Sequence, residues 1–317
     1  MTSSIRPADP LTRRHALAGA GFLAAAATLA ACSSGDPLSP SERATSGASG
    51  AAGTVVVGCQ QYYSNEIIAE LYAQAIEAAG LTVDRQYQIG QREAYLPELE
   101  SGAIAVMPEY GGNLLQYYVQ DTTATDSASI QAALKEVLPD GLTVLNPAQA
   151  TDQDSYTVTR ATADRYSLTS IGDLTALGRT VTVAANSEFA TRPYGPDGLK
   201  EVYGVDATVT PVEDSGGPLT VGALVDGTVD AADIYTSNPV IEDNDLVVLE
   251  DPENLVLPQN VTPLVAGSLD QAAVAAINAV NAVLTTDELR ALNARSTQEK
   301  LKSSEIASDW LTEKGLV

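Results

Sequence analysis

Two stretches of the 317-residue chain repeat one spacing of glycine and tyrosine, and this repeat constrains the fold more than any other feature. Residues 102–110 begin with a glycine and reach Tyr110 eight positions later, and residues 227–235 place Tyr235 at the same spacing. The first stretch has the pattern of a short buried strand whose end carries polar side chains. We therefore expect two similar lobes, each presenting one tyrosine at a strand end toward a shared ligand.

Strand, loop and helix patterns alternate along both halves of the chain. The β-branched run 54–58 precedes a polar loop, and residues 64–79 carry an apolar helical stripe with Ser64 as its N-cap and Gly80 as its stop. Further strands are expected at 81–89, 103–107, 142–145, 157–159, 180–184, 207–212, 246–251 and 260–265, and one more strand is expected to end at Tyr235. Further helices are expected at 92–101, 126–138, 197–203, 219–225, 269–284, 287–294 and 304–314. The first half is βαβαβ, which predicts a parallel sheet with ligands beyond the carboxyl ends of its strands.

Two segments are candidate crossings between the halves. One is the polar stretch 152–156, and the other is the proline-containing stretch 251–259. Two crossings make the first lobe discontinuous, so we expect residues 54–153 plus 257–317 to form lobe I and residues 154–256 to form lobe II. The predicted fold is α/β, a two-lobed periplasmic-binding-protein clamshell with two hinge crossings. A single doubly wound sheet is the competing architecture, but the paired tyrosine stretches favour two lobes.

The first 31 residues have the pattern of an export signal. Arg13 and Arg14 precede an Ala/Leu/Gly-rich run that is too short to span a membrane stably. This region resembles a twin-arginine signal, and residues 29–32 resemble the lipobox of bacterial lipoproteins, in which Cys32 becomes the lipidated first residue. Residues 1–31 are therefore expected to be a lipoprotein signal peptide. An uncleaved anchor helix is the alternative, and both place the folded domain outside the cytoplasmic membrane.

The chain after the signal begins with a low-complexity segment and is strongly acidic. Residues 32–53 are expected to be a flexible tether, because Ser, Gly, Ala, Pro and Thr bury too little apolar area to offset ordering. Without the signal, the chain has 14 basic and 40 acidic residues. Nucleic acid and acidic lipid headgroups are therefore poor partners, and we expect no nucleic acid to bind. Such a field would gather a cationic ligand, although solubility explains an acidic surface equally well.

The chain lacks the side chains that several kinds of catalysis require. His15, the only histidine, lies in the signal, and Cys59 is the only thiol left once Cys32 is lipidated. Intrachain disulfides, zinc sites built on Cys or His, and hydrolysis with a histidine base are excluded. Residues 213–218 resemble the nucleophile motif of serine proteases, but the serine has no base. We therefore expect that the protein holds no metal and no cofactor, and that it is not an enzyme. An enzyme on a binding-protein scaffold is the alternative from another class.

Tyrosine dominates the aromatic residues, with 13 Tyr against two Phe and one Trp. Tyr110, Tyr156 and Tyr235 lie at strand ends or at a crossing, where they can line a cleft. Ordinary packing is expected for the tyrosines on regular elements, Tyr72, Tyr87, Tyr166 and Tyr203. Several rings around one volume attract a cation by about 0.5–2 kcal/mol per contact. A quaternary ammonium group is the natural guest, because it cannot satisfy hydrogen-bond acceptors.

A ligand carboxylate would need donors in the same cleft. Arg192 is the best-placed guanidinium, and Gln60 and Asn113 can assist it. The alternative for Arg192 is an ordinary surface cation.

Several motifs together resemble one family. They are Val-Val-Val-Gly-Cys-Gln at 55–60, the helix at 67–80, Leu-Glu-Ser-Gly-Ala-Ile at 99–104 with Pro-Glu-Tyr-Gly-Gly at 108–112, and residues 223–231 leading to Tyr235. They resemble the glycine betaine/choline/carnitine substrate-binding proteins of ABC importers, over essentially all of residues 54–317. The resemblance implies a tyrosine cage around the trimethylammonium group, and it assigns Tyr110, Tyr156 and Tyr235 to the cage. It also implies that Arg192 receives the ligand carboxylate and that Gln60 reaches the same group.

Two positions depart from the family pattern. The usual Glu-Tyr-Thr-Gly-Thr is Glu-Tyr-Gly-Gly-Asn here, so that Asn113 replaces a threonine that assists carboxylate binding. Gln259 stands where another cage tyrosine normally follows two prolines. Losing one ring opens room for a larger or more polar cation. Asn113 and Gln259 would then be hydrogen-bonding specificity groups in a receptor for another polar cationic or amino-acid-like solute.

The resemblance also implies partners and a location. It predicts an extracytoplasmic receptor, held on the outer face of the cell membrane by a lipid anchor only. Such a receptor passes a small quaternary ammonium ligand to an ABC permease and ATPase complex.

Overall fold

The computed structural model describes residues 53–317. The expected signal peptide, the lipidation site Cys32 and the expected tether up to residue 52 lie outside the described residues. In residues 53–317, no helix is both long and apolar enough to cross a membrane.

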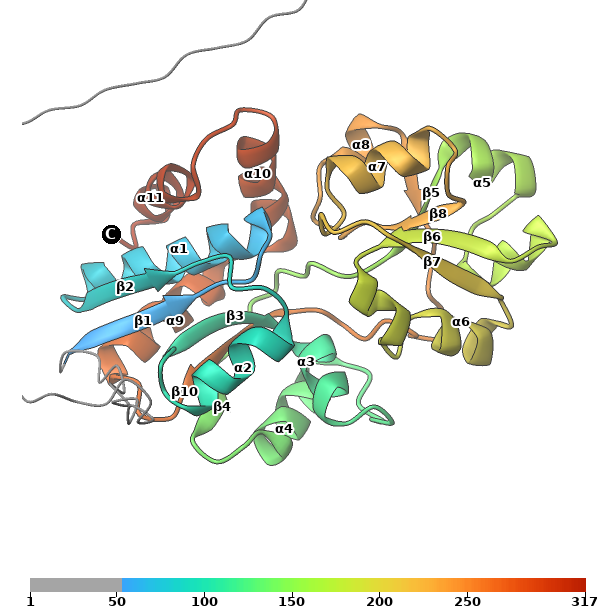
Figure 1. Ribbon diagram of the computed structural model, residues 1–317. Coiled ribbons are helices and arrows are strands. Elements are labelled where there is room, and N and C mark those ends of the chain that lie inside the picture. Colours follow the sequence, from blue (N-terminus) through green and yellow to red (C-terminus); the bar gives the residue numbers. More distant parts are fainter. Residues whose placement is uncertain (1–52) are drawn as a thin grey trace, which may run out of the picture. The chain divides into compact units, whose positions relative to one another are not determined.

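The first of two sheets contains the predicted βαβαβ unit and two strands from further along the chain (Figure 1). Its order is β2 (Thr82–Gln86), β1 (Thr54–Gly58), β3 (Val106–Tyr110), β10 (Val261–Ala266) and β4 (Leu142–Val144). As predicted, β1 pairs in parallel with β2 and β3. The sheet as a whole is mixed, because β10 runs antiparallel to both β3 and β4. The carboxyl ends of β1 and β3 therefore share one edge.

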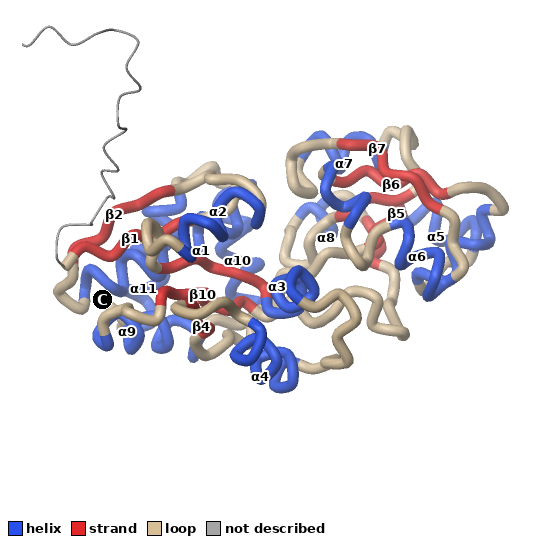
Figure 2. The backbone as a smooth tube through the Cα atoms, turned by 60° about the horizontal axis from the view of Figure 1, so that its bottom comes forward, coloured by secondary structure: helices blue, strands red, loops and turns tan. Residues whose placement is uncertain are grey.

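The second sheet repeats this arrangement with the middle part of the chain (Figure 2). Its order is β7 (Ala207–Pro211), β6 (Val181–Ala185), β8 (Ala231–Asp233), β5 (Tyr156–Thr159) and β9 (Leu246–Val248). Here β6 pairs in parallel with β7 and β8, and β5 runs antiparallel to β8 and β9. The chain leaves the first sheet after β4 and returns to it as β10. The fold is thus the predicted two-lobed α/β fold, and the single-sheet alternative is wrong.

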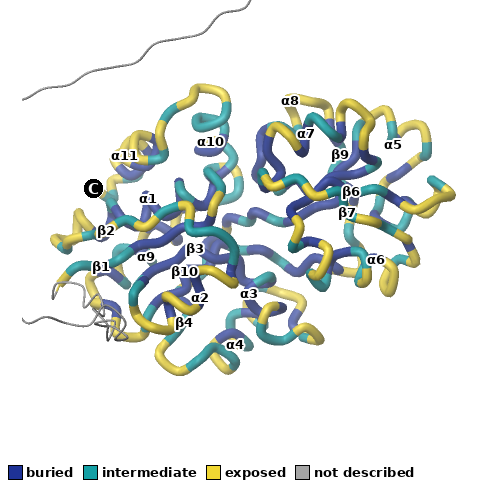
Figure 3. Tube along the Cα trace, in the orientation of Figure 1, coloured by how far each residue is buried: buried dark blue, intermediate teal, exposed yellow. Residues whose placement is uncertain are grey.

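Helices cover both faces of the first sheet. One face carries α1 (Tyr63–Ala78), α9 (Gln271–Val283), α10 (Thr286–Thr297) and α11 (Ser303–Lys314), and the other carries α2 (Arg92–Glu100), α3 (Gly111–Tyr118) and α4 (Ser127–Val137). Successive strand residues point to opposite faces, so Val106 packs into the first core and Met107 into the second. Figure 3 shows the central strands buried between these layers.

The second sheet is covered in the same way. One face carries α5 (Arg160–Tyr166), α6 (Pro196–Tyr203) and the short 3-10 helices η1 (Ile171–Leu177) and η2 (Ser187–Thr191), and the other carries α7 (Pro218–Val225) and α8 (Val240–Asp243). Val183 and Ala184 of β6 point into these two cores respectively. Each sheet therefore has a core on both faces, and its strand ends are left to carry polar side chains.

Local predictions differ from the structure at three places. The strand that was expected to end at Tyr235 is β8, which ends at Asp233. The first long helix begins at Tyr63, and Ser64 does not cap it, because the Ser64 hydroxyl donates a hydrogen bond to Asp152 at 2.9 Å. The predicted strand at 103–107 is instead β3, which ends at Tyr110, and α3 follows it at once. Glycines disfavour helix, so the pair that opens α3 gave no helical signal in the sequence.

Candidate functional site

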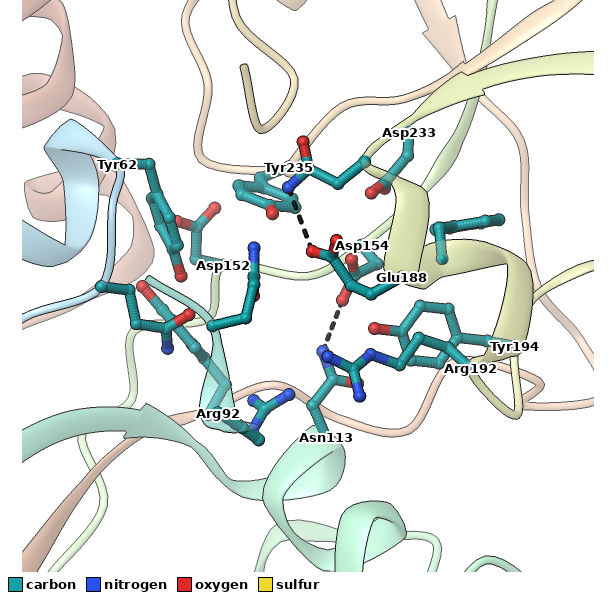
Figure 4. A pocket seen from close by; sticks show the side chains of 15 residues that line it. Tyr62, Arg92, Asn113, Asp152, Asp154, Glu188, Arg192, Tyr194, Asp233 and Tyr235 are labelled. Carbon is teal, nitrogen blue, oxygen red and sulfur yellow. Dashed lines mark hydrogen bonds between the residues drawn. The ribbon is translucent and has the colours of Figure 1, made fainter. Parts of the chain in front are cut away.

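A pocket lies at the carboxyl ends of strands from both sheets (Figure 4). It contains about 460 Å³ of space not filled by atoms, part of which opens to solvent. Its lining comes from the loop after β1, the start of α2, the end of β3, the first crossing, the segment after β6 and the end of β8. The lining residues are Gln60, Tyr62, Gln91, Arg92, Tyr110, Asn113, Asp152, Asp154, Asn186, Glu188, Phe189, Arg192, Tyr194, Asp233 and Tyr235.

The junction of β3 and α3 places two of the predicted residues in the pocket. Tyr110 is the last residue of β3, and Asn113 lies in the first turn of α3. The turn packs tightly against the second crossing, where a Cβ atom added to Gly112 would lie 2.7 Å from Leu257 Cβ and 2.8 Å from the Pro258 carbonyl oxygen. Glycine is therefore required at position 112, and it brings Asn113 close to the crossing.

Three tyrosine rings meet in the pocket. The ring centroid of Tyr62 lies 6.4 Å from that of Tyr110, with the planes stacked, and 5.2 Å from that of Tyr235. Burial raises the pKa of all three hydroxyls well above the usual value, so the rings are neutral at physiological pH. The sequence interpretation missed Tyr62. It lies in the polar loop directly after β1, so the rule that selected Tyr110 and Tyr235 would also have selected it.

Four carboxylates line the same pocket, and the sequence interpretation found none of them. Burial raises the pKa of Asp152 to about 6, and it raises the pKa of Glu188 and Asp233 as well. Asp154 accepts a hydrogen bond from Asn113 Nδ2 at 2.5 Å, and Asp233 accepts one from the Ser155 amide at 3.1 Å. The pocket is therefore strongly acidic.

Two guanidinium groups also line the pocket, each beside a glutamate. Arg92 is buried and donates to Glu109 through Nε and Nη2, each at 2.8 Å. Arg192 Nη1 lies 3.1 Å from Glu93, and its side chain is 13% exposed. Arg192 is thus not the surface cation of the alternative interpretation. The sequence did not single out Arg92, because its buried partner Glu109 comes from another element.

Gln60 has a donor without a partner. Its side chain is 4% exposed, and Nε2 forms no hydrogen bond with any described residue. A buried unsatisfied donor costs roughly 1–3 kcal/mol, so it favours an acceptor supplied by a ligand or by water. Gln60 is therefore suited to contact a ligand oxygen.

A family comparison identifies the kind of protein to which the chain belongs. The model of the family described as the substrate-binding domain of ABC-type glycine betaine transport systems matches residues 53–313. The chain belongs to this family. It is thus a substrate-binding receptor of an ABC importer and not an enzyme. Such a receptor works outside the cytoplasm, and its partners are a small-molecule ligand, a permease and an ATPase.

Individual relatives are distant but are covered over most of their length. The receptor is 26% identical to the glycine betaine-binding protein YehZ of Escherichia coli, over 84% of this chain and 92% of YehZ. It is 25% identical to a glycine-betaine-binding protein of Pseudomonas aeruginosa, over 83% of this chain and 89% of that protein. A crystal structure described as a glycine betaine/carnitine/choline ABC transporter matches it with a TM-score of 0.66 at 21% identity, over 83% of this chain and 99% of that one. This structural match shows the shared fold.

Two predicted site residues do not line the pocket of the receptor. The Tyr156 hydroxyl donates to the Tyr194 carbonyl at 2.7 Å, and its ring packs edge-on against Phe189 at 5.7 Å. Gln259 is fully buried. Its Oε1 accepts a hydrogen bond from the backbone amide of Asn113 at 3.0 Å, and its Nε2 donates one to Asn113 Oδ1 at 2.8 Å. Both side chains therefore contact residues of the pocket wall, whereas Gln60, Tyr110, Asn113, Arg192 and Tyr235 line it directly.

Proposed function

We propose that this receptor binds a quaternary ammonium solute between its lobes, with Tyr62, Tyr110 and Tyr235 around the ammonium group. The observation that carries the proposal is the meeting of these three rings, two from the first lobe and one from the second, at one acidic pocket. Neutral rings attract a cation through their quadrupole, and a quaternary ammonium needs no hydrogen-bond acceptor. The solutes that fit are glycine betaine, choline, carnitine and proline betaine.

The proposal gives the other predicted residues distinct roles. Arg192 and Gln60 receive the ligand carboxylate where there is one, since Gln60 Nε2 has no protein partner among the described residues. Asn113 lines the pocket and can assist them. Tyr156, predicted as a cage ring, acts instead by holding Phe189 and Tyr194 in place.

The proposal keeps the predicted lobes and anchor. Lobe I comprises residues 54–153 and 257–317, lobe II comprises residues 154–256, and they close on the ligand about the two crossings. Lipidation of Cys32 holds the receptor at the outer face of the membrane.

Calorimetric titration with the four solutes tests the ligand class. We expect at least one of them to bind, and absence of binding by all four would overturn the proposal. For the tightest solute, Tyr235→Leu removes the ring and keeps apolar bulk, whereas Tyr235→Phe keeps the ring face.

We expect Tyr235→Leu to weaken affinity by about tenfold and Tyr235→Phe by no more than about threefold. Tyr166→Leu is the control, because Tyr166 lies at the end of α5 and does not line the pocket. Equal losses in the Leu and Phe variants of Tyr235 would contradict the cage.

A further inference from the structure

The pocket has more carboxylates than the proposed ligand explains. Its two arginines are already paired, Arg92 with Glu109 and Arg192 with Glu93. Among the described residues, no cationic side chain forms an ion pair with any of the four pocket carboxylates, Asp152, Asp154, Glu188 and Asp233. A zwitterionic ligand has no net charge, so it would leave the unpaired carboxylates of the pocket without a compensating positive charge.

Asp152 has a structural role that accounts for its burial. It accepts hydrogen bonds from the Ser64 hydroxyl at 2.9 Å, and from the hydroxyl and the amide of Ser237 at 2.6 and 3.2 Å. These partners come from α1 in the first lobe and from the segment after β8 in the second. Asp152 is thereby supplied with three donors, and a ligand is not needed to explain it.

Asp154 and Asp233 are different, because each receives only one hydrogen bond from the described residues. The donors are Asn113 Nδ2 for Asp154 and the Ser155 amide for Asp233. A carboxylate can accept about four hydrogen bonds. Burial and the neighbouring Asp154 carboxylate raise the pKa of Asp233 well above its usual value, so the two side chains lie near each other. Glu188 likewise accepts only one, from Asn186 Nδ2 at 3.2 Å, so spare acceptor capacity remains at Asp154, Asp233 and Glu188.

The pair lies at one end of the pocket. After burial, Asp154 and Asp233 are the charges that most raise the pKa of the Tyr235 hydroxyl, whereas Asp152 contributes to the raised pKa of Tyr62. Figure 4 shows the same order, with Tyr62 and Asp152 on one side of Tyr235 and the pair on the other. A cation held by Tyr62, Tyr110 and Tyr235 would thus have the pair beside it.

We propose that the ligand carries, besides its quaternary ammonium group, an O–H or N–H arm that donates a hydrogen bond to Asp154 and Asp233. The inference rests on the proposed function, because the cage fixes the head of the ligand. A trimethylammonium group cannot donate a hydrogen bond, so the cage alone leaves the remaining acceptor sites of Asp154 and Asp233 unfilled. A donating arm fills its spare acceptor sites, and a ligand with a net positive charge also offsets the excess of carboxylates.

Pairs of ligands that differ in the hydrogen-bond donor test whether the arm contributes to binding. Choline is compared with its methyl ether, carnitine with its deoxy analogue γ-butyrobetaine, and aminoethyl-trimethylammonium with propyl-trimethylammonium. In each pair the donor is lost and the ammonium head is kept; the ether also adds a methyl group, and the third pair also loses the positive charge of the protonated amine. Calorimetric titration of the wild-type receptor should show the donor binding roughly tenfold to a hundredfold more tightly in at least one pair.

Two variants locate the effect. Asp154→Asn and Asp233→Asn should reduce the preference for the donor ligand in that pair, while the ether or deoxy ligand keeps its affinity to within about threefold. Asp164→Asn is the control, because Asp164 is exposed on α5. Equal affinities within all three pairs would overturn the inference and leave the proposed function standing. No binding by any quaternary ammonium ligand would overturn the proposed function, and this inference with it.

Discussion

Asp152 offers a direct test of how the crossing between the lobes is held. It is 5% exposed, and it accepts hydrogen bonds from Ser64 on the first lobe and Ser237 on the second. Burial raises its pKa from 3.8 to about 6 despite these bonds. The perturbation is Asp152→Asn, which removes the charge and keeps one acceptor oxygen for Ser237.

The sign of the effect follows from linkage. A carboxyl whose pKa is raised on folding binds its proton more tightly in the folded state, so its contribution to stability falls as pH rises from the unfolded to the folded pKa. A rise of about two pKa units corresponds to about 3 kcal/mol, fully expressed above about pH 6. Asparagine does not titrate. The free energy of unfolding of Asp152→Asn, relative to wild type, should therefore increase by about 3 kcal/mol between about pH 3.5 and pH 7.

Urea unfolding followed by far-UV circular dichroism at several pH values between about 3.5 and 7.5 measures this difference. Other buried carboxyls titrate in the same window, but they are common to both proteins and cancel in the comparison. Asp164→Asn, at an exposed position on α5, is the matched control for the loss of one carboxylate. A difference between Asp152→Asn and wild type that stays constant across the range would refute the assignment of a raised pKa to Asp152.

Two further predictions concern the tight turn and the membrane anchor. Gly112→Ala should destabilise the receptor by about 1–3 kcal/mol in urea unfolding, because the added Cβ would lie 2.7 Å from Leu257 Cβ, and it should weaken ligand binding by displacing Asn113. Gly222→Ala, where an added Cβ meets no atom within 4 Å, is the control, and equal stability of the two variants would contradict the packing argument. Cys32→Ser should shift the receptor from the membrane fraction to the soluble fraction in immunoblots of fractionated cells, and unchanged membrane association would contradict the lipid anchor.

Local patterns predicted most of the fold. The β-branched run of β1 and the apolar stripe of α1 are short-range signals, and both were confirmed to within a few residues. The antiparallel pairing of β10 with β3 was not predicted, because no local pattern specifies a partner strand that lies about 150 residues away in the chain. Helix α3 was missed as well, since Gly112 in its first turn is selected by contact with Leu257 and Pro258 and not by helix propensity.

The site, too, could be predicted only where a local sequence pattern marks a residue, and not where contacts between distant parts of the chain decide. Tyr110 and Tyr235 could be found because a strand end followed by polar residues is visible in one sequence. Asp154 and Asp233 could not be found, because a chain with 41 acidic residues gives no local sign of which few are buried. Burial and adjacency of the pair arise only when the first crossing meets the end of β8, where Asp233 lies opposite Tyr156 in the sheet.

The two departures from the family pattern, Asn113 and Gln259, looked independent in the sequence, but they are partners in the structure. Gln259 donates a hydrogen bond to Asn113 Oδ1 and thereby fixes the orientation of the side-chain amide of Asn113. In this orientation, Asn113 Nδ2 donates to Asp154. The two contacts with Asn113 use separate atoms of the Gln259 side-chain amide, Oε1 and Nε2, whereas a tyrosine has a single hydroxyl oxygen. The replacement therefore exchanges an aromatic ring for a polar connection from the second crossing to Asp154, which we propose as an acceptor for the ligand. We therefore expect Gln259, although it lies outside the pocket, to affect which ligand the pocket prefers through Asn113 and Asp154.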